Sequence, residues 1–357
     1  MMPCGAARLG AVTTTDDQPT PAPGDADSDN GLDLRARLLT RRTLLSVLLA
    51  AVLLFLLFRV LLELDPGAML DLFLRADPLL LAGAFLAHYL TFPLRGWRWR
   101  YLLARAGMPI RLRDATEIFC LSWFVNLLAP ARLGDVYRAY LLRSSVRAPL
   151  PHTFGTLLIE RAADILGVFV IAVAAGFWSF GGRVSGAAQT LLLVGIGLAL
   201  GVVLITVGLV RARRWLIEHL PRRAARIWEG VHDGAASSLT PRAIGTIGAV
   251  TAGIWLLEGL RLYLVVASLA LPEIGIGFST AVFVALIGAM FSILPLTPAG
   301  IGFVEAGAIY ALTLYGVSTD AAATAALMDR SITLVSVLVL GAILYVLSRK
   351  ARRGPAA

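Results

Sequence analysis

The feature that most constrains this chain is a series of apolar runs about as long as a lipid bilayer is thick. Residues 43–62 carry one charged residue, and residues 190–210, TLLLVGIGLALGVVLITVGLV, carry none. A helix needs roughly 20 apolar residues to cross a bilayer. Hydrophobic residues make up 58% of the chain and charged residues only 15%, whereas a soluble domain carries about 25% charged residues. We therefore expect an all-α polytopic integral membrane protein.

The net charge of +9 lies mainly in arginine clusters beside the apolar runs, at residues 35–42, 95–113, 211–226 and 349–353. Basic residues collect on the cytoplasmic side of a membrane. The pattern therefore predicts a protein of the cell inner (cytoplasmic) membrane with both termini in the cytoplasm, and it argues against nucleic-acid binding. Residues 1–40 are expected to form a disordered cytoplasmic tail, and residues 349–357 a basic cytoplasmic one. The two cysteines and four scattered histidines form no metal-ligand pattern, and we expect no catalytic motif, metal or cofactor.

An even number of crossings must separate two cytoplasmic clusters, which predicts about six full spans. Their approximate limits are 43–62, 78–100, 153–180, 188–210, 242–270 and 321–348. Residues 115–129 are too short to cross comfortably and are followed by Pro130. They are expected to enter the membrane, break and return to the same side. By the same reasoning, residues 279–295 and 301–316 form a second re-entrant broken-helix hairpin, and broken backbone at this depth must be enclosed by protein or line a cavity.

One phrase occurs twice, as PARLGDV at residues 130–136 and as PAGIGFV at residues 298–304. Further residues match around both copies at similar spacing. They are Gly96-Trp97-Arg98 with Gly259-Leu260-Arg261, 34 and 39 residues upstream, and Glu160-Arg161 with Asp329-Arg330, 30 and 31 residues downstream. Because the expected topology runs in opposite directions through the two copies, it predicts an inverted-topology repeat, with repeat one at about 78–180 and repeat two at about 242–348. Transporters of this architecture bind substrate between the repeats near the midplane.

Each break starts a new half-helix inside the membrane, and the first N–H groups of that half-helix lack helical partners. Such a helix end attracts anions. Gly134, Gly300 and Gly302 leave the backbone accessible because they have no side chain. Arg132 adds a positive charge at the first break, and Asn126 can form a hydrogen bond across that hairpin. The alternative is that both breaks serve packing only.

Ionisable residues within spans are costly and usually face a cavity or a partner. Arg161 and Asp164 are three residues apart, as are Glu258 and Arg261. Each pair can therefore neutralise itself along one helix face, which is the alternative to ligand binding. Glu305 has no basic residue nearby in the sequence, so its partner must be a distant arginine, a proton or a substrate amine.

The arginines that end the span at 78–100 are typical interface anchors, and Arg95 and Arg100 are interpreted in this way. Arg98 is preferred as a functional residue because its counterpart in repeat two, Arg261, lies well inside an apolar run. The full set of candidate substrate-binding residues is Arg98, Asn126, Arg132, Gly134, Asp135, Arg138, Glu160, Arg161, Asp164, Glu258, Arg261, Gly300, Gly302, Glu305 and Arg330.

Several stretches resemble the motif series of a known family: RGWRWRYLL, NLLAPARLGDVYRAYLL, ERAADILGVFV, PLTPAGIGFVEAGAIYAL and AAATAALMDRSITL. They are similar to the flippase-like transmembrane domain of lysylphosphatidylglycerol synthases and its stand-alone relatives. The resemblance covers about residues 45–348, so residues 43–348 are expected to form this domain. In the family the second hairpin usually has two adjacent glycines, where this chain has Ala299 and Gly300. This difference bears on how closely the second anion site is built.

The resemblance implies a lipid flippase that moves a charged lipid across the membrane, such as a phospholipid, aminoacylated phosphatidylglycerol or another lipid-linked substrate. Its expected partners are membrane lipids with anionic or zwitterionic head groups, and the sequence leaves open a homo-oligomer. Because the chain ends at Ala357, without an aminoacyl-transferase domain, we expect a transporter rather than an enzyme. The alternative is an integral-membrane enzyme or subunit acting on a polyprenyl phosphate or phospholipid, for which Asp135 and Glu305 are the candidate carboxylates.

Overall fold

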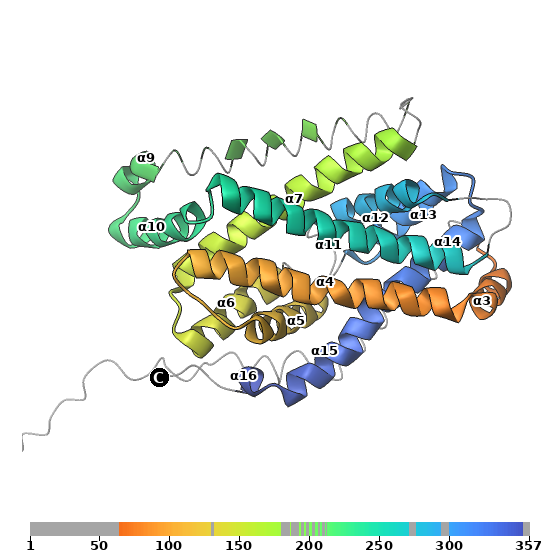
Figure 1. Ribbon diagram of the computed structural model, residues 1–357, viewed down its shortest axis with the longest axis horizontal. Helices are drawn as coiled ribbons and strands as arrows, with labels where there is room; N and C mark the ends of the chain where they lie inside the picture. The colour runs from red at the N-terminus through yellow and green to blue at the C-terminus, as the bar shows by residue number, and fades with distance from the viewer. Residues whose placement is uncertain are drawn as a thin grey trace, which may run out of the picture.

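The computed structural model describes residues 64–129, 132–179, 213–270, 276–293 and 300–352, together with isolated residues between 186 and 211. Within these residues the secondary structure is helical and contains no strand, which confirms the predicted all-α fold (Figure 1). The tail at 1–40, the span at 43–62, most of the span at 188–210 and residues 353–357 lie outside the described residues.

The described helices agree closely with the spans and hairpins expected from the sequence. Three of them are long and apolar enough to cross a membrane: α4, α11 and the continuous helix Thr319–Leu347. The full series is α3 Pro66–Arg75, α4 Pro78–Arg105, α5 Leu112–Leu128, α6 Leu133–Val146, α7 Leu150–Ser179, α9 Arg213–His219, α10 Arg222–Ala236, α11 Pro241–Ser268, α12 Phe278–Ile293, α13 Phe303–Thr313, α14 Thr319–Arg330, η3 Ser331–Val335, α15 Ser336–Leu347 and α16 Arg349–Arg352.

The helices form two copies of one unit that run in opposite directions. Repeat one consists of α4, the hairpin α5–α6 and α7, and repeat two consists of α11, the hairpin α12–α13 and the helix made of α14, η3 and α15. In Figure 1, α4 and α11 lie side by side and antiparallel, and the two hairpins open toward opposite ends of the molecule. Both α4 and α11 begin with a capping side chain followed by proline, at Asp77-Pro78 and Thr240-Pro241.

The first helix of each repeat packs against its own hairpin at an equivalent glycine. A Cβ atom added to Gly96 of α4 would lie 2.9 Å from the Cα of Thr116 in α5. A Cβ atom added to Gly259 of α11 would likewise lie 2.9 Å from the Cα of Val282 in α12. Real Cβ atoms do not approach backbone this closely. The two G-x-R tripeptides found in the sequence therefore contain a glycine because two helices touch there.

Replacing Gly259 by alanine is expected to lower the free energy of unfolding by about 1–3 kcal/mol, the usual cost of overpacking a tight contact. The matched control is Gly248→Ala in the same helix, because a Cβ atom there meets nothing within 4 Å. That change should leave stability the same or raise it by up to about 1 kcal/mol through helix propensity. Unfolding in mixed detergent micelles measures both variants, and equal effects would contradict the glycine contact.

The part of the basic C-terminal tail that is described, α16, packs beside the start of α5. Lys350 Nζ lies 2.7 Å from the carboxylate of Asp114 and also contacts Glu117. The Ser348 hydroxyl donates to the Glu117 carboxylate at 2.6 Å. The tail therefore begins as a helical turn bound to repeat one.

Candidate functional site

A cavity of about 450 Å³ lies where the two repeats meet. One part of its wall is apolar and includes Val168 of α7, Leu262 of α11 and Val284 of α12. The rest is strongly charged. The candidate residues that line the cavity are Asn126, Arg132, Arg161, Asp164, Glu258, Arg261, Gly300, Glu305 and Arg330. The remaining candidates, Arg98, Gly134, Asp135, Arg138, Glu160 and Gly302, are not among the residues that line it.

Arg98 lies at the centre of a buried ion-pair cluster in repeat one, and its side chain is fully buried. Its Nη1 donates to Asp164 Oδ1 at 2.6 Å and to the Thr251 hydroxyl of α11 at 2.7 Å. Its Nη2 lies 3.2 Å from Glu160 Oε1. The two carboxylates neutralise the charge of Arg98. The hydrogen bond to Thr251 links the two repeats.

Arg138 of α6 completes this cluster from the other side of Glu160. Its Nη2 donates to Glu160 Oε2 at 2.6 Å, and its guanidinium lies 4.0 Å from the centroid of the Trp99 ring. Glu160 thus binds both arginines, and none of the three residues is among those that line the cavity. Their predicted role as substrate ligands stays a prediction.

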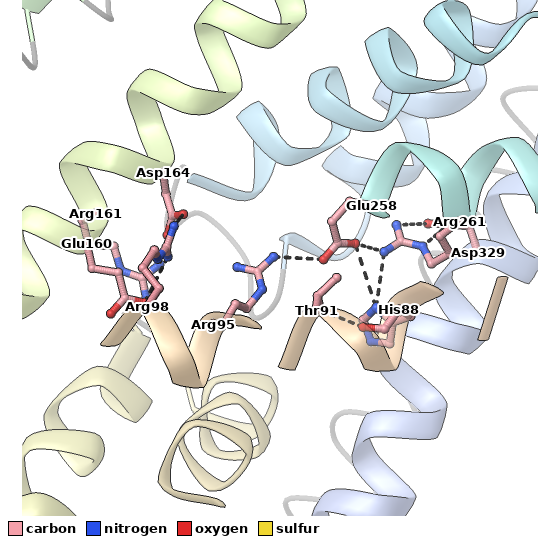
Figure 2. Close-up of polar contacts among 10 residues, drawn as sticks. All are labelled: His88, Thr91, Arg95, Arg98, Glu160, Arg161, Asp164, Glu258, Arg261 and Asp329. Carbon is pink, nitrogen blue, oxygen red and sulfur yellow. Dashed lines mark hydrogen bonds and ion pairs between the residues drawn. The ribbon is translucent and has the colours of Figure 1, made fainter. Parts of the chain in front are cut away.

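Repeat two contains the equivalent cluster around Arg261. Arg261 Nε and Nη2 donate to the two carboxylate oxygens of Asp329 at 2.6 and 3.1 Å, and Nη1 donates to Glu258. His88 of α4 is also in contact, with its Nδ1 3.4 Å from Arg261 Nη1. Figure 2 shows the two clusters on either side of Arg95. The i, i+3 pair Glu258–Arg261 that the spacing predicts is present, but its members also bind other helices.

A second kind of ion pair repeats at the two hairpin breaks. Arg161 of α7 donates to Asp135, near the start of α6, at 2.8 Å. Arg330, at the end of α14, donates to Glu305, near the start of α13, at 2.6 Å. The partner that the sequence required for Glu305 is therefore a distant arginine. Both candidate catalytic carboxylates, Asp135 and Glu305, therefore form an ion pair with an arginine.

The prediction of an anion site at each half-helix N-terminus needs a correction. At both N-termini a protein side chain already accepts a hydrogen bond from one of the N–H groups. The N–H of Gly134 donates to Asn126 Oδ1 at 2.8 Å, and the N–H of Gly302 donates to Glu305 Oε2 at 2.6 Å. An unpaired N–H inside a membrane is costly, so a nearby side chain caps it. The predicted bond of Asn126 across the first hairpin is confirmed.

The third residues of the two phrases, Arg132 and Gly300, differ in chemistry but both have a positive φ. Arg132 follows Ala131 at the first break and has a φ of 56°, and Gly300 occupies the same place in the second phrase with a φ of 68°. A left-handed conformation suits glycine and is strained for arginine. Such strain is concentrated at functional sites, and Arg132 lines the cavity.

Sequence reasoning missed some of the residues that line the cavity: His88, Arg95, Trp123, Trp255 and Asp329. Arg95 was interpreted as an interface anchor, yet only 4% of its side chain is exposed. Its spacing of three residues from Arg98 places both on one helix face, and this was the available signal. Asp329 is the repeat counterpart of Glu160 and could have been found from the repeat alone.

Cations slightly outnumber carboxylates in the polar layer of the described residues. The arginines are Arg95, Arg98, Arg132, Arg138, Arg161, Arg261 and Arg330, and the carboxylates are Asp135, Glu160, Asp164, Glu258, Glu305 and Asp329. The excess lies in repeat one. The layer as a whole is therefore better suited to an added anion than to an added cation. The described residues contain no group of His, Cys, Asp and Glu that could hold a metal ion.

Comparisons with known proteins find one matching family model and several similar proteins. The family model described as the lysylphosphatidylglycerol synthase TM region matches residues 43–341. A protein named Glycosyltransferase AglD, from Haloferax volcanii, is 28% identical over 338 residues, which covers 84% of this chain and 54% of that protein. A UPF0104 membrane protein of Methanocaldococcus jannaschii is 27% identical over 65% of this chain and 97% of its own length. Another, from Methanothermobacter thermautotrophicus, is 23% identical over 78% of this chain and 89% of its length.

The similarity to the Haloferax protein corrects one prediction. The sequence predicts a transporter and not an enzyme. The name of this relative contradicts that expectation, because this chain is similar to just over half of a protein that is named as a glycosyltransferase.

Proposed function

This chain belongs to the lysylphosphatidylglycerol synthase transmembrane-region family, and on that premise we propose that it is an integral-membrane enzyme, or the membrane subunit of one, that acts on a lipid-linked substrate. The substrate class is a polyprenyl phosphate or a phospholipid. Its phosphate would lie in the cavity between the repeats, and its hydrocarbon chain would lie along the apolar wall. The name of the Haloferax relative supports an enzymatic role.

The observation that carries this proposal is the composition of the cavity wall. Arg95, Arg132 and Arg161 of repeat one line it together with apolar residues of α7, α11 and α12. Arginine binds phosphate with several directed N–H donors, and such charge-assisted bonds are stronger where water is excluded. A volume of about 450 Å³ is within the usual range for a small-molecule pocket, roughly 300–1,000 Å³.

The test is lipid mass spectrometry on the protein purified in native-like nanodiscs, followed by incubation with a labelled polyprenyl phosphate or phospholipid. We expect a phosphate lipid to copurify with the protein. Ala285→Phe, which places a ring in the cavity, should reduce the amount of bound lipid. Ala236→Phe, at the end of α10, is the control outside the cavity. Equal lipid profiles for both variants and an empty nanodisc would refute the proposal.

A second candidate function is translocation of the same lipid, the predicted flippase activity. The antiparallel packing of α4 and α11 favours it, because inverted repeats that meet at a substrate cavity are the usual basis of alternating access. A labelled lipid that moves between leaflets of a proteoliposome without covalent change would support translocation. A covalently changed lipid would support the enzymatic proposal.

The orientation in the membrane is part of the proposal. The ends of α4 and α6 lie at the same end of the molecule as α9 and α10 (Figure 1), and this end carries several of the arginines. By the positive-inside rule this end would be cytoplasmic. A cysteine introduced at Ser144 in α6 should react with a membrane-impermeant maleimide only from the cytoplasmic side. Labelling from outside in intact cells would reverse the orientation.

Replacing Arg132 by glycine is expected to change stability and lipid binding in opposite directions. Glycine removes the left-handed strain of arginine, so the free energy of unfolding should rise by up to about 1 kcal/mol. Phosphate-lipid binding should weaken about ten- to a hundredfold, because a hydrogen bond to a charged group is lost. Lipid titration and detergent unfolding measure the two effects. Arg349→Gly on the exposed face of α16 is the control, and a fall in stability at Arg132 would contradict the strain argument.

A further inference from the structure

Arg95 differs from the other buried arginines in how little of its hydrogen-bonding capacity the protein uses. Its one hydrogen bond within the described residues runs from Nη2 to Glu258 Oε1, at 2.9 Å. A guanidinium has five N–H donors, so most of its donors have no protein partner there. By contrast, Arg98 and Arg261 each make several bonds to carboxylates. The Nε atoms of Arg98 and Arg138 are sealed from solvent, whereas no nitrogen of Arg95 is sealed off without a partner.

Two tryptophans from different repeats hold the Arg95 guanidinium in place. It lies 5.0 Å from the centroid of the Trp123 ring in α5 and 5.5 Å from that of Trp255 in α11. Arginine stacks well on aromatic faces within about 6 Å. Such contacts use the faces of the guanidinium and leave N–H donors at its edges. Arg95, Trp123, Trp255 and Glu258 all line the cavity, so the unused donors belong to the site.

Arg95 also occupies a central position. Figure 2 shows it between the Arg98 cluster and the Arg261 cluster, with its guanidinium extended toward Glu258. Glu258 does not depend on Arg95 for charge compensation, since it also accepts a bond from Arg261. Arg95 can therefore take a second anion without leaving Glu258 uncompensated. Arg261, which binds both oxygens of Asp329, has no comparable freedom.

We propose that Arg95, held between Trp123 and Trp255, binds the phosphate group of the lipid substrate alongside Arg132, and that Glu258 competes with that phosphate for the Arg95 guanidinium. This inference rests on the proposed function and assigns the contact within its cavity. A lipid phosphate is favoured over free phosphate because Ile165, Val168 and Leu262 provide an apolar wall in the same cavity. Replacing the two residues of this ion pair should therefore have opposite effects. Loss of the Arg95 charge should weaken phosphate-lipid binding, and loss of the Glu258 charge should strengthen it.

The experiment is a titration of each variant, in nanodiscs of a neutral lipid, with fluorescent phosphatidic acid and with the matched uncharged diacylglycerol. Arg95→Gln should weaken phosphatidic acid binding at least about tenfold, the effect of losing hydrogen bonds to a charged group. Glu258→Gln should strengthen it about threefold or more, because a competing negative charge is removed. Diacylglycerol binding should stay the same in both. The matched control is Arg100→Gln, in the same helix but outside the cavity, where Nε bonds the carbonyl of Ile110.

The outcomes separate this inference from the proposed function. If the wild-type protein binds phosphatidic acid no better than diacylglycerol, the proposed function and the inference both fail. If the wild type binds it and Arg95→Gln binds equally well, or Glu258→Gln weakens binding, only the inference fails. If Arg95→Gln does not fold, the sign of the Glu258→Gln effect decides. Full displacement of the probe by an equal concentration of inorganic phosphate would overturn the assignment to a lipid.

Discussion

Replacing Glu160 by alanine is expected to lower the free energy of unfolding by about 3–5 kcal/mol, the usual cost of removing one partner from a buried ion pair. Glu160 is 1% exposed and accepts hydrogen bonds from Arg98 and Arg138, both of which have fully buried side chains. Within the described residues, Glu160 is the only carboxylate bonded to Arg138. Its loss therefore leaves one guanidinium without a counter-ion in a low-dielectric interior.

Unfolding in mixed detergent micelles measures this effect, and Asp71→Ala is the matched control. Asp71 and Arg75 form an ion pair of 2.9 Å on α3, and both side chains are more than half exposed. A pair of this kind contributes at most about 0.5 kcal/mol. A loss of less than about 1 kcal/mol for Glu160→Ala would mean that water reaches the cluster, and the buried ion pairs of Glu160 would then not stabilise repeat one.

The fold could be predicted from the sequence because its main determinants are local. Apolar length identifies the spans, and proline and glycine identify the breaks at residues 130–134 and 298–302. The order of the elements is then fixed by the parity of membrane crossings. The hairpins α5–α6 and α12–α13 follow this reasoning to within a few residues at each described end. None of these steps requires information about which helices are in contact.

The site was harder to predict because its pairings join distant parts of the chain. Arg95 and Glu258 are 163 residues apart, and Arg261 and Asp329 are 68 apart. Spacing showed that Arg161 could reach Asp164 along one helix, but the closer partner of Arg161 is Asp135 on another helix, at 2.8 Å against 3.8 Å. Sequence patterns identified which residues are ionisable and buried. Only the packing of α4 against α11 decides which arginine has donors left for a ligand.

The repeated phrase has glycine at a matching position for two different physical reasons. Gly134 has an ordinary helical conformation but contacts the backbone of α5, where an added Cβ atom would lie 2.6 Å from Asn126 Oδ1 and closer still to the carbonyl oxygen of Ser122. Gly302 has a φ of 93°, a conformation that other residues rarely adopt. The matching letters therefore indicate a shared break in the helix and not an identical contact.

Replacing Gly134 by alanine should thus cost more than replacing Gly302. For Gly134 we expect a loss of about 2–4 kcal/mol in the free energy of unfolding, because overpacking against backbone is added to the loss of the hydrogen bond to Asn126. For Gly302 the expected loss is about 1–3 kcal/mol, the strain of a non-glycine residue in a sparsely populated backbone conformation with positive φ. Detergent unfolding of both variants, with Gly245→Ala as the control that meets nothing within 4 Å, measures the difference. If Gly302→Ala were the more harmful change, the close approach of α6 to α5 would not be what requires glycine in the first copy of the phrase.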